Sequence, residues 1–590
     1  MTLEALLGEL SVDEAWQHVE HIAGRIPSRL AGSPNARRMA EYAHERLARS
    51  GLESRLDEFA GLVSFPEAGL LRVLTPERWE ITANTLGHSA STDGLEGELV
   101  YVGSGAESEY EGKEVRGRIT LSELSYSPAR HEKALIAWRR GSIGQVMMNW
   151  GHDANAAVPF GSMKSAWGNP SPEALQTEMP DLPCLGISRA DGLRLKQRCL
   201  EGTVRVWLRA RASNGWHQLT MTSAELGAAG RSPGAPGGFL LLGGHMDSWP
   251  GPQATDNAAG SACILELARV FGRRRDELRR GLVVGLWMGH ETGTMISSTR
   301  FADVRWDRLR RDCVAYLQID QPGMAGTSTW RLDSTDEAQG YLVRATREVV
   351  GDAPVHWQRM RRSGDTSFFG VGLPTIAGIM SFRDDEIRQT ALATLGWWHH
   401  SLENTLDKVD RERLAEHLMV YARWTWDLLT GRLLPYEYAP SATRLVERID
   451  QLAAHPLPEI NLAGLAERGR ALQRVAARLD ARVAAERASA STDDAPAERL
   501  NRAMIELSRT LVPIASTVSG PYGQDRYGHA WQAETIPSLT WLPLLAGQRP
   551  DSEEFQSGWV SAVRARNRVA DALEHATGLA QRALDDVGLQ

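Results

Sequence analysis

Hydrophobic and polar positions in the central part of the chain alternate between two patterns. The runs GFLLLGG at 238–244 and LVVGLWMG at 282–289 are short, apolar and bounded by glycine, which is typical of buried strands. Between them, AAGSACILELARVFGRR has the apolar spacing of a helix. Strands and helices continue to alternate from about residue 216 to 430. This alternation predicts an α/β fold with a doubly wound, mostly parallel sheet.

The segments on either side have other patterns. A helical apolar pattern covers residues 10–50, and short strands with one helical stretch follow later in the chain. Near the end, apolar residues recur at three- and four-residue spacing, which predicts long amphipathic helices. We therefore expect a first part of the α/β domain, an inserted β-rich domain, a second part of the α/β domain that carries the site, and a helical domain, at 1–94, 95–212, 213–435 and 436–590.

Composition and charge exclude several classes of protein. The net charge of −8 over 590 residues is small and does not favour a general nucleic-acid binder. Four cysteines are too few for a disulfide framework, and the absence of CxxC spacing argues against a cysteine–zinc site or thioredoxin-like chemistry. A reducing compartment suits them. The first residues do not resemble a secretory signal, and no window has the apolar length of a membrane span. We expect a cytoplasmic protein that binds neither membranes nor nucleic acids.

Acidic and histidine side chains follow the predicted buried strands. His245 and Asp247 come just after the first run, His290 and Glu291 after the second, and Asp320 ends a third strand in LQID. Taken singly, each is better explained as a surface carboxylate or a core histidine. Ligands in open α/β sheets gather beyond the carboxyl ends of the strands, so the joint placement predicts a common site.

Two further segments add candidate ligands. Asp256 precedes the helix after the first run and, taken alone, is best explained as a helix N-cap. His399 and His400 lie together in HHSLENTLDKVD. Taken from these candidates, a set of two histidines and three carboxylates suits two divalent ions about 3.5–4 Å apart. Asp256 would be the carboxylate that both ions share. We expect zinc, although manganese, cobalt and iron also suit these ligands. Such a pair of ions supports amide hydrolysis.

A supporting role is predicted for Asp247. It is too close in sequence to His245 to be a separate ligand, and it suits the orientation of the His245 imidazole.

The order of these motifs resembles the co-catalytic zinc aminopeptidase superfamily, and most of all its glutamate carboxypeptidase and transferrin receptor branch. The motifs are GGHMDSW, ATDNAAG, LWMGHETG, LQIDQPG, SGDTSFFGVGLPTIAG and HHSLENTLDKVD. The resemblance implies that the inserted domain is a protease-associated domain. It also implies that the helical domain is a dimerisation domain, and hence that the protein is a homodimer.

The resemblance also implies a division of the ligands. His245 and Asp320 bind one ion, Glu291 and His400 bind the other, and Asp256 bridges the two. His400 is preferred to His399 because His400-Ser401 precedes Thr405 as in the late histidine motif of the family. Asp365 in SGDTSFF matches a family motif beside the site, and a structural role is expected for it.

One position departs from the family pattern. His290 stands where the family's hydrolases carry the glutamate that acts as general base. Three interpretations follow. The protein is a peptidase or amidohydrolase with His290 as proton carrier, or a metalloenzyme redirected to another C–N cleavage or deamination of a small amino-acid-like molecule. The third interpretation is a non-catalytic, receptor-like binding protein. A loss of metal ligands would indicate this case, but the sequence keeps all five ligand types.

Overall fold

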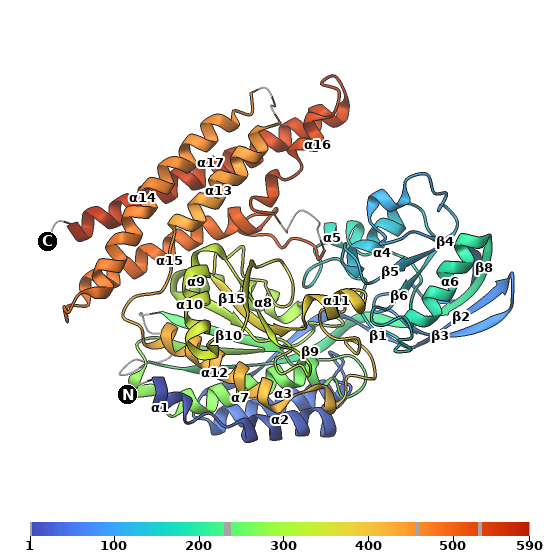
Figure 1. The fold of residues 1–590 in the computed structure, drawn as a ribbon, viewed down its shortest axis with the longest axis horizontal. Helices are drawn as coiled ribbons and strands as arrows, with labels where there is room; N and C mark the ends of the chain where they lie inside the picture. Colours follow the sequence, from blue (N-terminus) through green and yellow to red (C-terminus); the bar gives the residue numbers. More distant parts are fainter. Residues whose placement is uncertain (1–2, 229–237, 456, 458, 529–533, 589–590) are drawn as a thin grey trace.

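The computed structural model describes residues 3–228, 238–455, 457, 459–528 and 534–588. Three parts are visible in Figure 1: an α/β domain, a β-barrel at one side of it, and a group of long helices above it. Among the described residues, no helix is both long and apolar enough to cross a membrane.

An eight-stranded mixed sheet forms the centre of the α/β domain. Its order is β1-β9-β11-β10-β12-β15-β13-β14. The four central strands, β11, β10, β12 and β15, are parallel, whereas β1, β9 and β13 introduce antiparallel pairs. The sheet agrees with the predicted α/β fold, but only its centre is parallel throughout. The strands are β1 Glu53–Pro66, β9 Ala212–Leu226, β10 Phe239–His245, β11 Gly281–Trp287, β12 Cys313–Gln318, β13 Thr329–Ser334, β14 Val355–Arg359 and β15 Thr375–Ser381.

Helices cover both faces of this sheet (Figure 1). On one face lie α2 Val12–Arg25, α3 Pro34–Arg49, α7 Ala259–Gly272 and α12 Arg411–Thr430; on the other lie α8 Ile296–Val304 and α9 Trp306–Asp312. Smaller helices are α1 Leu3–Leu7, α10 Gln339–Val350 and α11 Asp384–Gln389.

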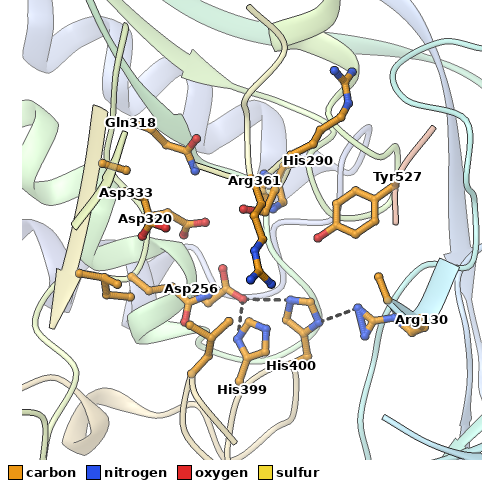
Figure 2. Close-up of a pocket in the computed structure, with 18 of the residues that line it drawn as sticks. Arg130, Asp256, His290, Gln318, Asp320, Asp333, Arg361, His399, His400 and Tyr527 are labelled. Carbon is orange, nitrogen blue, oxygen red and sulfur yellow. Dashed lines mark hydrogen bonds and ion pairs between the residues drawn. The ribbon is translucent and has the colours of Figure 1, made fainter. Parts of the chain in front are cut away.

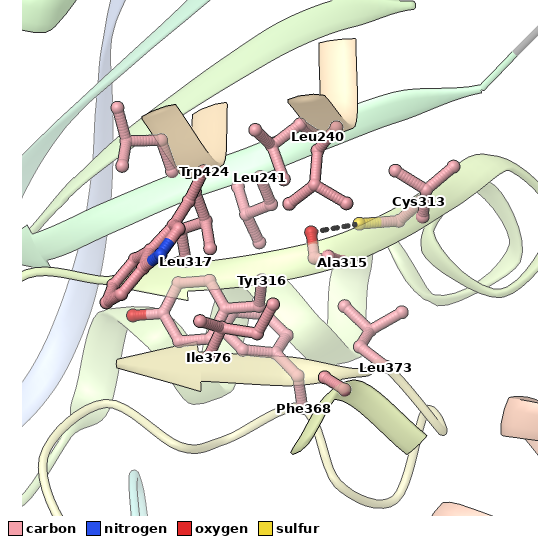
Figure 3. Close-up of a cluster of buried hydrophobic side chains, with 14 of the residues drawn as sticks. Leu240, Leu241, Cys313, Ala315, Tyr316, Leu317, Phe368, Leu373, Ile376 and Trp424 are labelled. Atoms are coloured by element: carbon pink, nitrogen blue, oxygen red, sulfur yellow. Dashed lines mark hydrogen bonds between the residues drawn. The ribbon is translucent and has the colours of Figure 1, made fainter. Parts of the chain in front are cut away.

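The core between the sheet and its helices is mostly apolar around β10 and β12. Leu241, Leu317, Ile376 and Trp424 are completely buried there (Figure 3). Burial of each such side chain contributes about 1.5–3 kcal/mol, so this core holds the central strands in a fixed register.

The barrel is inserted between β1 and β9. Its strands close in the order β2-β3-β7-β6-β5-β4-β8. They are β2 Ala68–Thr75, β3 Trp79–Thr85, β4 Thr92–Tyr101, β5 Ile119–Glu123, β6 Gly144–Met148, β7 Cys184–Ile187 and β8 Val204–Ala210, with helices α4 Arg130–Arg139, α5 Pro172–Thr177 and α6 Arg189–Glu201. The barrel begins at Ala68, earlier than the expected 95, because β2 pairs with β8 and therefore belongs to the barrel rather than to the sheet.

The C-terminal part, as far as the structure describes it, consists of long helices and the short helix α16. They are α13 Ala439–Ala453, α14 Leu462–Ala488, α15 Ala495–Ser516, α16 Leu542–Ala546 and α17 Glu553–Gly588. Arg509 of α15 attaches this part to the α/β domain, since its guanidinium donates to the carbonyls of Arg310 and Gly372, each at 2.7 Å. After α15 the chain runs to the barrel, where Arg526 forms an ion pair with Glu132 at 3.0 Å.

Candidate metal centre

The carboxyl ends of the central strands bring the predicted ligands together. His245 is the last residue of β10, and Glu291 and Asp320 follow the parallel neighbours β11 and β12. The Nε2 atom of His245 lies 3.1 Å from Asp256 Oδ1 and 3.4 Å from Asp320 Oδ1. The Nε2 atom of His400 lies 3.1 Å from Asp256 Oδ2 and 3.3 Å from Glu291 Oε1. Asp256 therefore presents one carboxyl oxygen to each histidine.

The donor atoms of this cluster are buried without ordinary partners. His245 Nε2, Asp256 Oδ2, Glu291 Oε1 and Asp320 Oδ1 have no hydrogen-bond partner among the residues that the structure describes. A buried polar atom left in this state costs about 1–3 kcal/mol, which a bound cation would offset. Bonds of about 2.0–2.1 Å to zinc place neighbouring tetrahedral donors roughly 3.3 Å apart, close to the separations found here. The residues fit divalent metal ions.

Asp256 is not the cap of the following helix. Helix α7 begins at Ala259 with Ala258 as its N-cap, and Asp256 has non-helical torsion angles (φ −125°, ψ 87°). The simple N-cap explanation is therefore wrong. Burial raises the pKa of the Asp256 carboxyl, but its contacts with His245 and His400 outweigh burial and hold that pKa well below its usual value.

Asn257, which the sequence analysis did not single out, positions Asp256. Its Oδ1 accepts hydrogen bonds from the backbone N–H groups of Gly260 (3.0 Å) and Gln321 (3.1 Å). Its Nδ2 donates to the carbonyls of His245 (3.2 Å) and Ile319 (3.1 Å). One side chain thus joins the ends of β10 and β12 to the start of α7. The only signal in the sequence was its place beside Asp256.

Asp247 acts differently from the prediction. Its carboxyl oxygens accept hydrogen bonds from the backbone N–H groups of His290 and Glu291, both at 3.1 Å. The His245 ring instead contacts the backbone carbonyl of Asp247, at 3.0 Å from Nδ1, while the nearest Asp247 carboxyl oxygen is 3.8 Å away. The carboxyl is directed at the loop after β11 because two N–H donors there compete for it. Burial raises the pKa of Asp247 to about 6.

The Glu291 carboxyl is fixed from behind by an indole. Trp249 is completely buried, and its Nε1 donates to Glu291 Oε2 at 2.7 Å. The other oxygen, Oε1, remains directed at His400.

His290 lies beside the cluster and is held by a carboxylate. Its ring stacks on that of His245, with ring centres 3.8 Å apart, and its Nδ1 is 2.9 Å from Asp365 Oδ2. Asp365 in turn accepts a hydrogen bond from Ser298 Oγ at 2.7 Å. Burial and His245 lower the pKa of His290, but the charge and hydrogen bond of Asp365 together with the charge of Glu291 raise it to about 9. Asp365 therefore orients His290, a role beyond the structural one expected.

The two adjacent histidines also stack on each other. The ring centres of His399 and His400 are 3.8 Å apart, and His399 Nδ1 lies 3.3 Å from Asp256 Oδ2. Only His400 of the two is also in an ion-pair contact with Glu291 among the described residues, which favours it for the Glu291 side of the cluster.

A cavity of about 520 Å³ opens onto this cluster. Away from the cluster, its lining includes residues from three separate parts of the chain. Arg130 comes from α4 of the barrel, Arg361 from the segment after β14, and Tyr527 from the segment after α15 (Figure 2). The Arg130 guanidinium lies 3.3 Å from His400 Nδ1. The sequence analysis identified none of these three residues, because each is remote from the metal motifs along the chain.

Comparisons with known proteins agree with the fold and the motifs. Residues 228–425 match the family model described as Peptidase family M28. The probable glutamate carboxypeptidase VP8 of Zea mays is 23% identical over 507 residues, covering 72% of this chain and 68% of that protein. The probable lipoprotein aminopeptidase LpqL of Mycobacterium tuberculosis is 23% identical over 447 residues, covering 70% and 83%.

Solved structures share the fold. BSAP, a zinc aminopeptidase from Bacillus subtilis, has a TM-score of 0.55 and 17% identity, covering 72% of this chain and 96% of that one. The resemblance to the zinc aminopeptidase superfamily is thereby confirmed, and so is the expectation of a metal-dependent hydrolase.

Proposed function

We propose that the protein is a dinuclear metal-dependent hydrolase that cleaves an amide or other C–N bond of a peptide or small amino-acid-like substrate. The observation that carries this proposal is the cluster around Asp256, in which four buried donor atoms have no hydrogen-bond partner among the described residues. The proposed division is His245 and Asp320 for one ion, Glu291 and His400 for the other, with Asp256 shared. Similarity to a zinc aminopeptidase supports zinc as the metal.

Bound divalent ions would lower the pKa of a water molecule and polarise the substrate carbonyl. His290 is the proposed proton carrier. Asp365 occupies its Nδ1, which leaves Nε2 to take a proton from the attacking water and return it to the leaving nitrogen. Two nearby cations lower the pKa of His290 from the value of about 9 that Asp365 promotes, and this brings it towards neutrality.

The cavity favours substrates with a carboxylate. Arg130 is half-buried at its wall, and Arg361 is an exposed residue of its rim. A guanidinium binds a carboxylate through charge-assisted hydrogen bonds. The description of one relative as a probable glutamate carboxypeptidase agrees with such a substrate.

A second candidate is a redirected reaction, namely another C–N cleavage or a deamination by the same metal centre. The observation that favours it is His290, since a carboxylate would already serve peptide hydrolysis. The receptor-like alternative is disfavoured, because the described structure brings all five proposed ligands together.

The test is to assay the zinc-loaded full chain against a panel of dipeptides and a panel of small N-substituted amino acids. Hydrolysis that a chelator abolishes and zinc restores supports the proposal. A protein that binds no divalent metal contradicts it.

We also propose that the barrel is a protease-associated domain and that the helices after residue 435 form a homodimer interface. The long amphipathic helices after residue 435 support the homodimer interface. Sedimentation at micromolar concentration tests it, and a single 65.0 kDa species would contradict it.

A further inference from the structure

His399 contacts two of the five proposed ligands, Asp256 and His400, but is not itself one of the five. Its Nδ1 is buried, faces Asp256 Oδ2 at 3.3 Å, and has no hydrogen-bond partner among the described residues. Figure 2 shows His399 and His400 side by side, with Asp256 as their common neighbour. A buried ring nitrogen without a partner is as costly here as the carboxyl oxygens of the cluster.

The two histidines lie at almost the same distance from Asp256 Oδ2. His400 Nε2 is 3.1 Å from this oxygen and His399 Nδ1 is 3.3 Å from it. Both values are close to the roughly 3.3 Å between neighbouring donors of a tetrahedral zinc ion. Asp256, His399 and His400 also form a group whose donor atoms all lie within 4.8 Å of one another.

We propose that His399 Nδ1 is a further metal ligand, on the same ion as His400. This inference rests on the metal centre of the proposed function. The ion beside His400 is then held by four protein groups, Asp256, Glu291, His399 and His400. The ion beside His245 is held by three, His245, Asp256 and Asp320.

The unequal numbers give the two ions different tasks. A fourth protein ligand leaves less room on an ion for water or substrate than three ligands do. The open position is therefore on the His245 side. His290 stacks on His245 and lines the cavity, so the proposed proton carrier is next to the ion that has room for the reacting groups.

The first experiment counts imidazole ligands in the wild-type full chain, so it does not depend on how a variant folds. Metal-free protein receives one equivalent of zinc, which fills the tighter position, and X-ray absorption spectroscopy measures its ligands. Two imidazoles on this single ion are expected, from His399 and His400. One imidazole would overturn the proposal.

The second experiment compares zinc affinities by competition with a chromophoric chelator. His399→Phe keeps a ring that can stack on His400 but removes the donor atom. The expected result is a loss of about 10–100-fold or more in the affinity of the tighter ion, with little change in the weaker one. The matched control is His131→Phe, at a histidine that lines the cavity outside every candidate metal group of the described residues. It should retain both affinities.

The outcomes separate this inference from the proposed function. If His399→Phe binds two zinc ions as tightly as the wild type, His399 is not a ligand, and the dinuclear hydrolase still stands. If the wild type binds no zinc, both proposals fail. A His399→Ala variant that regains its tighter ion when free imidazole is added would confirm that the lost group is a nitrogen donor.

Discussion

The two walls of the cavity are built in different ways. The metal wall includes His245, Glu291 and Asp320, at or just beyond the ends of β10, β11 and β12. The parallel pairing of these strands sets His245 opposite Trp287 and Gly243 opposite Gln318. The facing wall contains Arg130 of the barrel and Tyr527 of the segment after α15. Backbone hydrogen bonds fix the first wall, whereas contacts between separate parts of the chain assemble the second.

The contacts of the second wall are polar and aromatic, since the Tyr527 ring also stacks on Trp167, with ring centres 5.4 Å apart. Arg526 pairs with Glu132 at 3.0 Å, and the N–H of Tyr527 donates to the carbonyl of Ser165 at 2.8 Å. The comparison suggests that the sheet edge carries the metal chemistry, while packing between domains determines which substrate is bound. Changes in the first wall should therefore affect metal and turnover, and changes in the second should affect substrate affinity.

The largest effect is expected for the shared ligand of the metal wall. Asp256→Ala should lose most of the bound metal and nearly all activity, because both ions lose a ligand. The loss of metal affinity should exceed the roughly 10–100-fold typical of changes behind the ligands. Asp333→Ala is the control, at another carboxylate that lines the cavity. Elemental analysis decides between them, and full metal content in the Asp256 variant would refute the site.

The next largest effect is expected at His290. We expect His290→Glu to retain its metal but to lose the native reaction by about 10²–10⁴-fold, because the imidazole is required as proton carrier. The wild type should cleave ordinary dipeptides poorly. Both proteins are measured against peptides and small N-substituted amino acids. Rapid dipeptide cleavage by the wild type, equalled or exceeded by the glutamate variant, would identify a plain peptidase with an altered base instead.

A smaller effect is expected on the facing wall. Arg130→Met should raise KM for carboxylate-bearing substrates by roughly 10- to 150-fold, since a hydrogen bond to a charged group contributes about 1.5–3 kcal/mol. Metal content should not change. Arg361→Met, at an exposed residue of the rim, should have a weaker effect. If the Arg130 variant lost zinc while KM stayed constant, the division between the two walls would be wrong.

The smallest effect concerns Lys164, which connects the barrel to the loop after β11. Its buried ammonium donates to the carbonyls of Gly168 and Gly293, and burial lowers its pKa to about 7. An unfolded chain keeps the ordinary lysine pKa of about 10.4. Between about pH 7 and 10 the unfolded state therefore binds more protons, and stability rises with pH by at most about 1.4 kcal/mol per unit.

Lys164→Met should reduce this rise, of which a part remains because burial also lowers the pKa of Lys133 to about 7. Lys113→Met, at a partly exposed lysine of the barrel, should not change it. Melting temperatures at pH 7, 8 and 9.5 provide the measurement. An identical pH dependence in the wild type and the Lys164 variant would show that Lys164 is already charged in the folded protein.

Much of the metal wall could be predicted because its signals are local. Gly-bounded apolar runs locate β10 and β11, and the chemistry-bearing residues follow within a few positions of each strand. The role of Asp256 was harder to predict, because an aspartate before a helix usually caps it. Only the position of α7, which begins at Ala259, excludes that explanation.

The start of the barrel was missed for a related reason. The segments of β2 and β3 are ordinary strands in the sequence, and nothing local assigns them to the barrel rather than to the sheet. Pairing of β2 with β8, more than a hundred residues later, makes that assignment.

The sequence by itself determined which residue types follow each central strand, and hence that carboxylates and histidines meet at one edge of the sheet. Only the tertiary structure decided what lies opposite them and how each donor is oriented. Asn257 joining two strand ends, Asp365 holding His290, and Arg130 beside His400 are all contacts between residues distant in the chain or unmarked by any motif. Such contacts depend on how separate elements pack, and local patterns of hydrophobicity do not contain that information.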